Sequence, residues 1–238
     1  MDPMDFYAPF GPTTVQQRHP GFGVYYEPEE LVKAVNEGRC YATPYFTEDG
    51  HECLWNGPSW PYATTQTLKA MEHLLNGYAQ SFVSKADYLE LMHNYARSHR
   101  LTLEDGTVVP FIDENLDPFT GRWLARTWLQ SKKGVAWRLL PMEERGKDYN
   151  HSCFCDLVIS GLIGIQPCED DRIEVKPLIP EGSWDYFCLD HLLYHGREIT
   201  VVYDKTGERY GKGTGLRLYA DGKELAHADR LTALSAAL

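Results

Sequence analysis

The chain has 238 residues, of which 43% are apolar and 24% are charged, a composition typical of a globular protein with one or two packed domains. No stretch approaches the roughly 18 to 20 consecutive apolar residues of a membrane-spanning helix, so we expect no membrane segment. Because 34 acidic residues outnumber 23 basic ones, the net charge of −11 argues against nucleic acid as a partner.

The first 60 residues are rich in Pro, Gly and aromatic residues and show neither helical nor alternating periodicity. This pattern predicts ordered loops, with one short helix over residues 29–36 between Pro28 and Gly38.

From Thr65 onward apolar residues recur at helical spacing, which predicts a helix over 65–78 and a second over 85–98. Ser84 and Asp87 form a short capping box at the start of the second helix. Only about six residues separate the two, so we expect an antiparallel hairpin.

Residues 101–150 are mostly irregular, with a possible short helix over 123–130. Residues 152–165 are apolar almost all round, which predicts a buried helix. Gly161 and Gly164 would weaken that helix, so close contact with another helix is the expected reason for them.

Past Pro167 the apolar period changes from 3.6 to 2. Strands are predicted over 173–176 and 199–203, and a hairpin joins 216–220 to 223–226 through Asp221-Gly222. The chain therefore closes with a small antiparallel β domain. The glycine run 211–215 leads into a strand and not a helix, so it predicts no nucleotide cofactor.

Six cysteines are too few for a disulfide scaffold. His151, Cys153 and Cys155 lie at a spacing that turns Cys153 away from the other two on a helix, so we predict no metal site and no cofactor.

Two clusters precede the buried helix. The segment Trp55-Asn56-Gly57-Pro58-Ser59-Trp60-Pro61-Tyr62 presents three aromatic rings on a rigid backbone, which is typical either of a sugar-stacking platform or of a corner of the core. The loop over 111–121 carries three carboxylates, of which one could belong to the pair that glycoside hydrolysis needs. Alternatively, Asp117 starts a turn and Asp113 caps a backbone group.

A third cluster, Tyr149-Asn150-His151-Ser152, lies at the amino end of the predicted buried helix. The free N–H groups there could bind a carboxylate or a sugar hydroxyl, or Asn150 or Ser152 could act as a simple N-cap.

The order W-N-G-P-S-W-P at 55–61, E-N-L-D-P-F-T-G at 114–121, a buried helix and a β tail resembles the C-terminal part of mannosylglycerate-hydrolase-like glycoside hydrolases. These are relatives of the trehalases and processing α-glucosidases that share an (α/α)6 barrel. The resemblance implies a mainly α fold: a partial barrel of C-terminal helical hairpins over 1–168, followed by a short antiparallel β domain over 169–238.

The resemblance also implies an inverting glycosidase with a carbohydrate substrate and Glu114 as the general base. A sugar would be held between the indoles of Trp55 and Trp60, beside Asn56 and Asp117. Arg18 and His151 would face the same pocket.

No motif before Trp55 matches the family's general acid Asp, and most of the barrel's helices are not found. We therefore expect the C-terminal portion of a longer enzyme, whose exposed inner face would associate with a second copy or with an upstream barrel half. The alternative is a non-catalytic carbohydrate-binding or accessory module. The sequence does not indicate a compartment.

Overall fold

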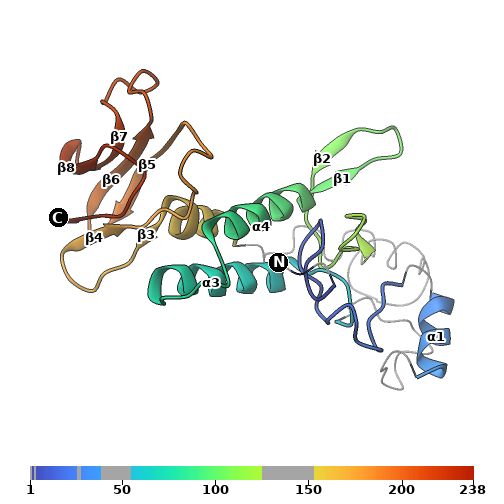
Figure 1. Ribbon diagram of the computed structural model, residues 1–238. Coiled ribbons are helices and arrows are strands. Elements are labelled where there is room, and N and C mark those ends of the chain that lie inside the picture. The colour runs from blue at the N-terminus through green and yellow to red at the C-terminus, as the bar shows by residue number, and fades with distance from the viewer. Residues whose placement is uncertain (1, 3, 26–27, 39–54, 125–152) are drawn as a thin grey trace. The chain divides into compact units, whose positions relative to one another are not determined.

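The computed structural model describes residues 2, 4–25, 28–38, 55–124 and 153–238 (Figure 1). The chain divides into two compact units, one of Met1–Thr67 with Leu91–Ser152 and one of Leu68–Glu90 with Cys153–Leu238. None of the helices in the described ranges is both long and apolar enough to cross a membrane.

Three helices confirm the predicted ones: α1 (Pro28–Asn36), α3 (Pro61–Gly77) and α4 (Lys85–Ser98). Helix α3 begins four residues before the predicted start, because Pro61 occupies its first turn, where a missing N–H costs nothing. Helix α4 has the predicted bounds, and the predicted capping box is formed at its start.

In that capping box the Ser84 backbone N–H donates to the Asp87 carboxylate at 2.8 Å, and the Asp87 backbone N–H donates to the Ser84 hydroxyl oxygen at 3.2 Å. At the other end of α4 the Tyr95 hydroxyl donates to the Pro61 carbonyl at 2.9 Å. The end of α4 therefore lies beside the start of α3, as an antiparallel hairpin requires, and Figure 1 shows the two helices side by side.

Residues 100–110 differ from the prediction of irregular chain. Strands β1 (Arg100–Thr102) and β2 (Val108–Pro110) form an antiparallel hairpin. Strands of three residues are too short to show an alternating pattern in the sequence. The helix predicted over 123–130 falls almost wholly outside the described residues.

The predicted helix over 152–165 consists of a short α-helical segment, α6 (Phe154–Leu157), followed by a π-helix, η2 (Val158–Ile163). Gly161 makes the expected close contact with a helix: a Cβ added to it would lie 1.9 Å from the Tyr88 hydroxyl oxygen of α4. The prediction for Gly164 is wrong. This residue ends the helix with a φ of 89° and packs against the backbone of Lys176 and Pro177.

The C-terminal part contains two antiparallel sheets, which confirms the predicted β domain. Three short strands form one sheet in the order β3-β4-β9: β3 (Ile165–Gln166), β4 (Arg172–Val175) and β9 (Leu234–Ala237). Four longer strands follow one another in the second sheet: β5 (Tyr186–Tyr194), β6 (Arg197–Asp204), β7 (Gly215–Ala220) and β8 (Lys223–Ala228).

The turn between β7 and β8 is the predicted one. Asp221 and Gly222 have φ angles of 50° and 76°, as both central residues of a type I′ turn require. The inner face of this sheet is fully buried at Ile199, Val201, Leu216 and Leu218, and these side chains form the core of the β domain.

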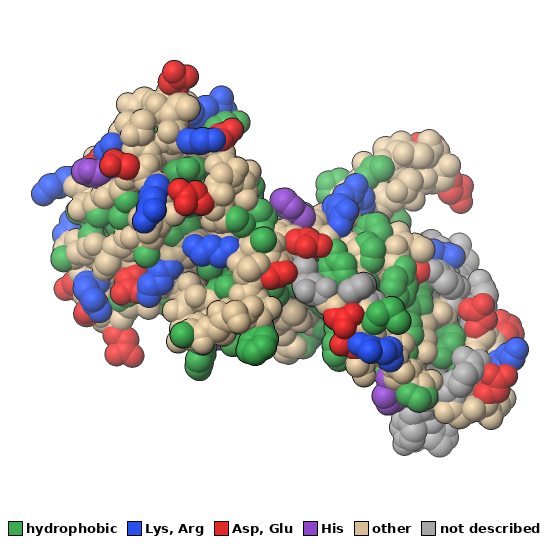
Figure 2. Space-filling view, viewed as in Figure 1, with side chains coloured by type: hydrophobic (Ala, Val, Ile, Leu, Met, Phe, Trp, Pro, Cys, Tyr) green, Lys and Arg blue, Asp and Glu red, His purple; other side chains and the backbone are tan. Residues whose placement is uncertain are grey.

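The described residues thus contain one helical hairpin and several antiparallel sheets, so the partial (α/α)6 barrel remains a prediction. On the face that Figure 2 draws, acidic and basic side chains are interspersed over the described surface, with no continuous basic area of the kind that binds a phosphate backbone.

Candidate active site

The aromatic segment at 55–61 and the acidic loop at 113–121 lie side by side in the first unit. The Ser59 N–H donates to the Leu116 carbonyl at 2.9 Å, and the Leu116 N–H donates to the Ser59 carbonyl at 3.0 Å. Leu116 also forms a bridge with Trp123 on its other side. The segment of Ser59 is therefore fixed by backbone hydrogen bonds to the loop over 113–124, which lies more than 50 residues further along the chain.

The N-terminal loops hold the same two segments from the outside. The Thr14 hydroxyl accepts from the Gly57 N–H at 3.1 Å and donates to the Pro58 carbonyl at 3.0 Å. The Phe10 N–H donates to the Pro118 carbonyl at 2.9 Å. These contacts explain why a stretch without regular secondary structure can present side chains rigidly.

The two tryptophans stack on each other. Their ring centroids are 4.0 Å apart and the ring planes are 17° from parallel. Trp60 is 3% exposed and Trp55 is 49% exposed. The expectation of a sugar held between the two indoles is therefore wrong, because the space between them is filled by their own contact. Trp55 supplies the exposed indole surface, and Trp60 supports it.

The acidic loop buries three polar side chains, Asp113, Asn115 and Asp117, each 3% exposed or less. Glu114, between the first two, is only partly buried. Its backbone N–H donates to the Asp113 carboxylate at 2.8 Å, and the Leu124 N–H donates to the Asn115 carbonyl at 3.1 Å. The backbone on both sides of Glu114 is thus fixed, while its own carboxylate is the more accessible one.

Asp117 starts a tight turn. Its carboxylate accepts hydrogen bonds from the Phe119 N–H at 2.8 Å and from the Thr120 hydroxyl at 2.7 Å. The Gly121 N–H closes the turn on the Asp117 carbonyl at 2.9 Å. This is the turn that the sequence suggested as the alternative role of Asp117, and the Asp117 side chain stabilises it.

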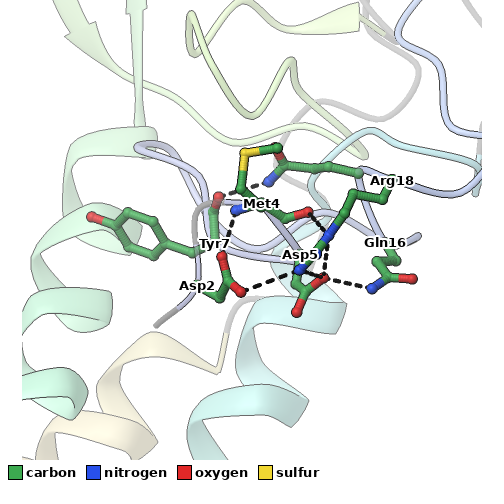
Figure 3. A network of polar contacts seen from close by, with 7 residues as sticks. Asp2, Met4, Asp5, Tyr7, Gln16 and Arg18 are labelled. Atoms are coloured by element: carbon green, nitrogen blue, oxygen red, sulfur yellow. Dashed lines mark hydrogen bonds and ion pairs between the residues drawn. The ribbon is translucent and has the colours of Figure 1, made fainter.

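Arg18 lies in a polar network with the first residues of the chain (Figure 3). Its guanidinium donates to the Asp5 carboxylate at 2.7 Å and to the Asp2 carboxylate at 3.2 Å. The Gln16 amide and this guanidinium together lower the pKa of Asp5. Arg18 is therefore paired with carboxylates of its own N-terminal segment.

The two remaining predicted residues have different outcomes. Asn56 lies in the aromatic segment, where its carbonyl accepts from the Gly23 N–H at 2.9 Å and its side-chain amide donates to the Gly21 carbonyl at 3.4 Å. His151 lies outside the described residues. Within the described ranges, no group of three or more His, Cys, Asp or Glu side chains could hold a metal ion.

Sequence reasoning missed the burial of Asp113 and Asn115. The sequence carries no signal of this burial, because Asp113, Glu114 and Asn115 are three consecutive polar residues and a single sequence does not show which side of such a loop faces the core.

Comparison with known proteins finds two glycoside hydrolase family models that match this chain. The family model for the mannosylglycerate hydrolase MGH1-like glycoside hydrolase domain matches residues 1–152, and that for the C-terminal domain of glycosyl hydrolase family 65 matches residues 167–227. A solved structure named "Sialidase" is 40% identical with a TM-score of 0.76. The match covers 99% of this chain but only 18% of the sialidase chain, so this chain spans less than a fifth of that structure's length.

The first of these matches covers more than half of the chain and includes both segments that meet at Ser59 and Leu116. The chain belongs to the family of MGH1-like glycoside hydrolase domains, and its residues 167–227 are similar to the C-terminal domain of glycosyl hydrolase family 65.

Proposed function

We propose that this chain carries the general-base side of an inverting glycosidase site, with Glu114 as the base. The observation that supports this most directly is the pair of backbone hydrogen bonds between Ser59 and Leu116, because it joins the loop of Glu114 to the segment of Trp55. In an inverting glycosidase an exposed indole can hold the sugar and one carboxylate activates the attacking water, so both on one rigid frame would supply the general-base side of the site.

In this mechanism Glu114 takes a proton from a water molecule while the water oxygen attacks the anomeric carbon. The bond to the leaving oxygen breaks, and a general acid protonates that oxygen. The acid and base carboxyl groups of inverting enzymes lie roughly 6.5 to 9.5 Å apart, which leaves room for the water. The turn already uses the Asp117 carboxylate, so Asp117 is not assigned as the acid. The family resemblance implies an Asp in a motif upstream of the Trp55 segment, which this sequence does not show, and on that ground we assign the general acid to an Asp outside this chain.

The exposed indole of Trp55 would bind the apolar face of the sugar, and its stacking on Trp60 would fix its orientation. Asn56 follows Trp55 directly and would lie at the edge of the same subsite. Arg18 and His151 are proposed for the same pocket by family resemblance alone, and Arg18 would first have to exchange its contacts with Asp2 and Asp5.

The substrate class follows from the relatives' names. The family is named for mannosylglycerate hydrolysis and the structural neighbour for sialidase activity. We propose a glycoside of mannose or of sialic acid as the first substrates to examine.

We also propose that α3 and α4 form one hairpin of an (α/α)6 barrel, with the barrel portion over 1–168 and the β domain over 169–238. An upstream barrel half or a second copy of the chain would then cover the open side of the hairpin.

Glu114→Gln tests the assignment in the protein that carries this chain. A glutamine keeps the size of the side chain but accepts no proton, so we expect turnover to fall by about 10²- to 10⁴-fold while sugar affinity is kept. The matched control is Glu104→Gln, at an exposed position near the β1–β2 turn. NMR of the first-formed product should show an inverted anomer in the parent protein.

Near-normal turnover of the Glu114→Gln variant would refute the base assignment. Sugar binding by the parent protein without any hydrolysis would favour the alternative, a non-catalytic carbohydrate-binding module.

A further inference from the structure

We propose that Phe119, supported by Phe22, forms a second sugar-binding surface, which takes the ring adjoining the one whose bond is cleaved. This inference rests on the proposed function, since it extends the site of Glu114 and Trp55 by one subsite.

The first argument is exposure. Phe119 is 44% exposed, although it lies five residues after Glu114 in a loop that buries three polar side chains. Phe111, at the other end of the same loop, packs edge-on against the buried Trp123, with ring centroids 5.5 Å apart. The core therefore accounts for Phe111 but leaves much of Phe119 in solvent.

The second argument is rigidity. The Asp117 carboxylate accepts from the N–H of Phe119 at 2.8 Å, and the next-but-one residue, Gly121, is bonded to the Asp117 carbonyl at 2.9 Å. Pro118, just before Phe119, accepts from the Phe10 N–H at 2.9 Å. A side chain on such a fixed backbone loses little conformational entropy when a ligand binds.

The third argument is the ring partner. Phe22 meets Phe119 in a T-shaped contact, with centroids 6.2 Å apart and planes at 74°. The residue after Phe22, Gly23, is hydrogen-bonded to Asn56, next to Trp55. The aromatic pair thus connects the loop of Glu114 to the segment that presents Trp55.

The chemistry of the surface points to a sugar ring. A half-exposed phenyl ring offers no hydrogen-bonding group, and a pyranose presents C–H groups on one face that pack on aromatic rings. An apolar patch of a single ring pair is too small for a protein interface, but it matches one sugar.

The test compares one-ring and two-ring ligands: methyl α-mannoside with a mannobiose, and N-acetylneuraminic acid with sialyllactose. Binding is measured by calorimetry in the protein that carries this chain. In Phe119→Ala we expect the dissociation constant of the two-ring ligand to rise about fivefold to tenfold, while that of the one-ring ligand changes less than twofold.

Two further variants separate stacking from folding. Phe119→Leu keeps an apolar side chain but no ring, so it should lose the two-ring preference with an unchanged melting temperature. Phe119→Trp should keep the preference. The matched control is Phe82→Ala, because Phe82 is 92% exposed in the connection between α3 and α4 and should affect neither ligand.

The proposal is overturned if Phe119→Ala weakens both ligands equally or neither, if the parent protein shows no preference for two rings, or if it binds none of the four ligands. Binding is read separately from turnover. A Glu114→Gln variant that still hydrolyses its substrate would therefore refute the assignment of the general base but not the proposed subsite. A failure of the two-ring preference would refute the subsite but not the assignment of the base.

Discussion

At the scale of single residues, the acidic loop separates two kinds of carboxylate. Asp113 and Asp117 are buried and bonded to backbone N–H groups, whereas Glu114 is only partly buried. Burying a carboxylate costs free energy unless hydrogen bonds compensate for the lost solvation, so Asp113 and Asp117 have structural roles. Glu114 is therefore the most accessible of the three residues, as its proposed role as general base requires.

Asp117→Ala should destabilise the turn, because the N–H of Phe119 and the hydroxyl of Thr120 lose their acceptor. We expect a loss of about 1 to 3 kcal/mol in the free energy of unfolding, measured by urea denaturation. Asp117→Asn keeps one acceptor oxygen and should lose less. Equal stability of the alanine variant and the parent protein would show that the turn does not depend on this side chain.

The sequence predicted the rigid presentation of the aromatic segment better than it predicted the exposure of its side chains. Rigid Pro and Gly positions indicated that Trp55 and Trp60 are presented on a fixed backbone, and the structure agrees. Their mutual stacking depends on side-chain torsions and on the neighbouring loops, which no local pattern records. For the same reason the pairing of Arg18 with Asp2 and Asp5 was not foreseen.

At the scale of elements, the bounds of a helix were predicted best where a capping motif and apolar residues at helical spacing occur together. Helix α4 has both a capping box and apolar residues at helical spacing, and its bounds were predicted without error. Strand β5 was missed because Asp190 and His191 fall at an irregularity between Leu189 and Leu192, which breaks the alternation. The π-helical geometry of η2 has no known signature in a single sequence.

Gly161→Ala tests the contact between η2 and α4. The added methyl group would lie 1.9 Å from the Tyr88 hydroxyl oxygen, which itself donates to the Leu157 carbonyl at 3.2 Å. Relief of this clash requires moving a fully buried ring, so we expect a loss of about 1 to 3 kcal/mol in unfolding experiments.

Gly77→Ala is the matched control, because a Cβ at Gly77 meets nothing within 4 Å at the end of α3. This substitution should leave stability unchanged or raise it by about 0.4 to 1 kcal/mol. A Gly161→Ala variant as stable as the Gly77→Ala variant would contradict the tight packing.

At the scale of the whole molecule, carboxyl groups whose pKa is lowered in the folded state make stability depend on pH. The pKa values of seven carboxyl groups lie below their ordinary values of 3.8 for Asp and 4.5 for Glu: Asp5, Asp87, Asp105, Asp190, Asp204, Asp221 and Glu224. At Asp87 the main cause is the hydrogen bond from Ser84. At Asp204 burial raises the pKa, but backbone N–H donors such as those of Tyr210 and Gly207 together outweigh it.

A carboxyl group with a lowered pKa in the folded state stabilises the fold when it is ionised. This stabilisation is complete above the unfolded pKa, near pH 4 to 5, and is lost as the pH falls through the lower folded values. We therefore expect the melting temperature to be nearly constant from about pH 7 to pH 5 and to fall steadily below about pH 4. Scanning calorimetry between about pH 7 and pH 3 measures this dependence of the melting temperature on pH.

Because most of these carboxyl groups are exposed, each contributes little to the free energy of unfolding, and the melting temperature should fall gradually with pH. Asp204→Asn should make the acid branch shallower, since the amide does not titrate. An equal melting temperature at about pH 3 and about pH 6 would contradict the assignment.

The bridge between Ser59 and Leu116 also determines how the chain can change over time. The chain leaves the bridge after Trp60 and returns to it before Leu116, so the residues in between form one long connection whose two ends are held together. Insertions or deletions in the turn around Tyr78–Ser84 would change the length of this connection without separating its ends. Relatives of this fold could therefore vary in length at this turn while the two segments of the candidate site stay joined.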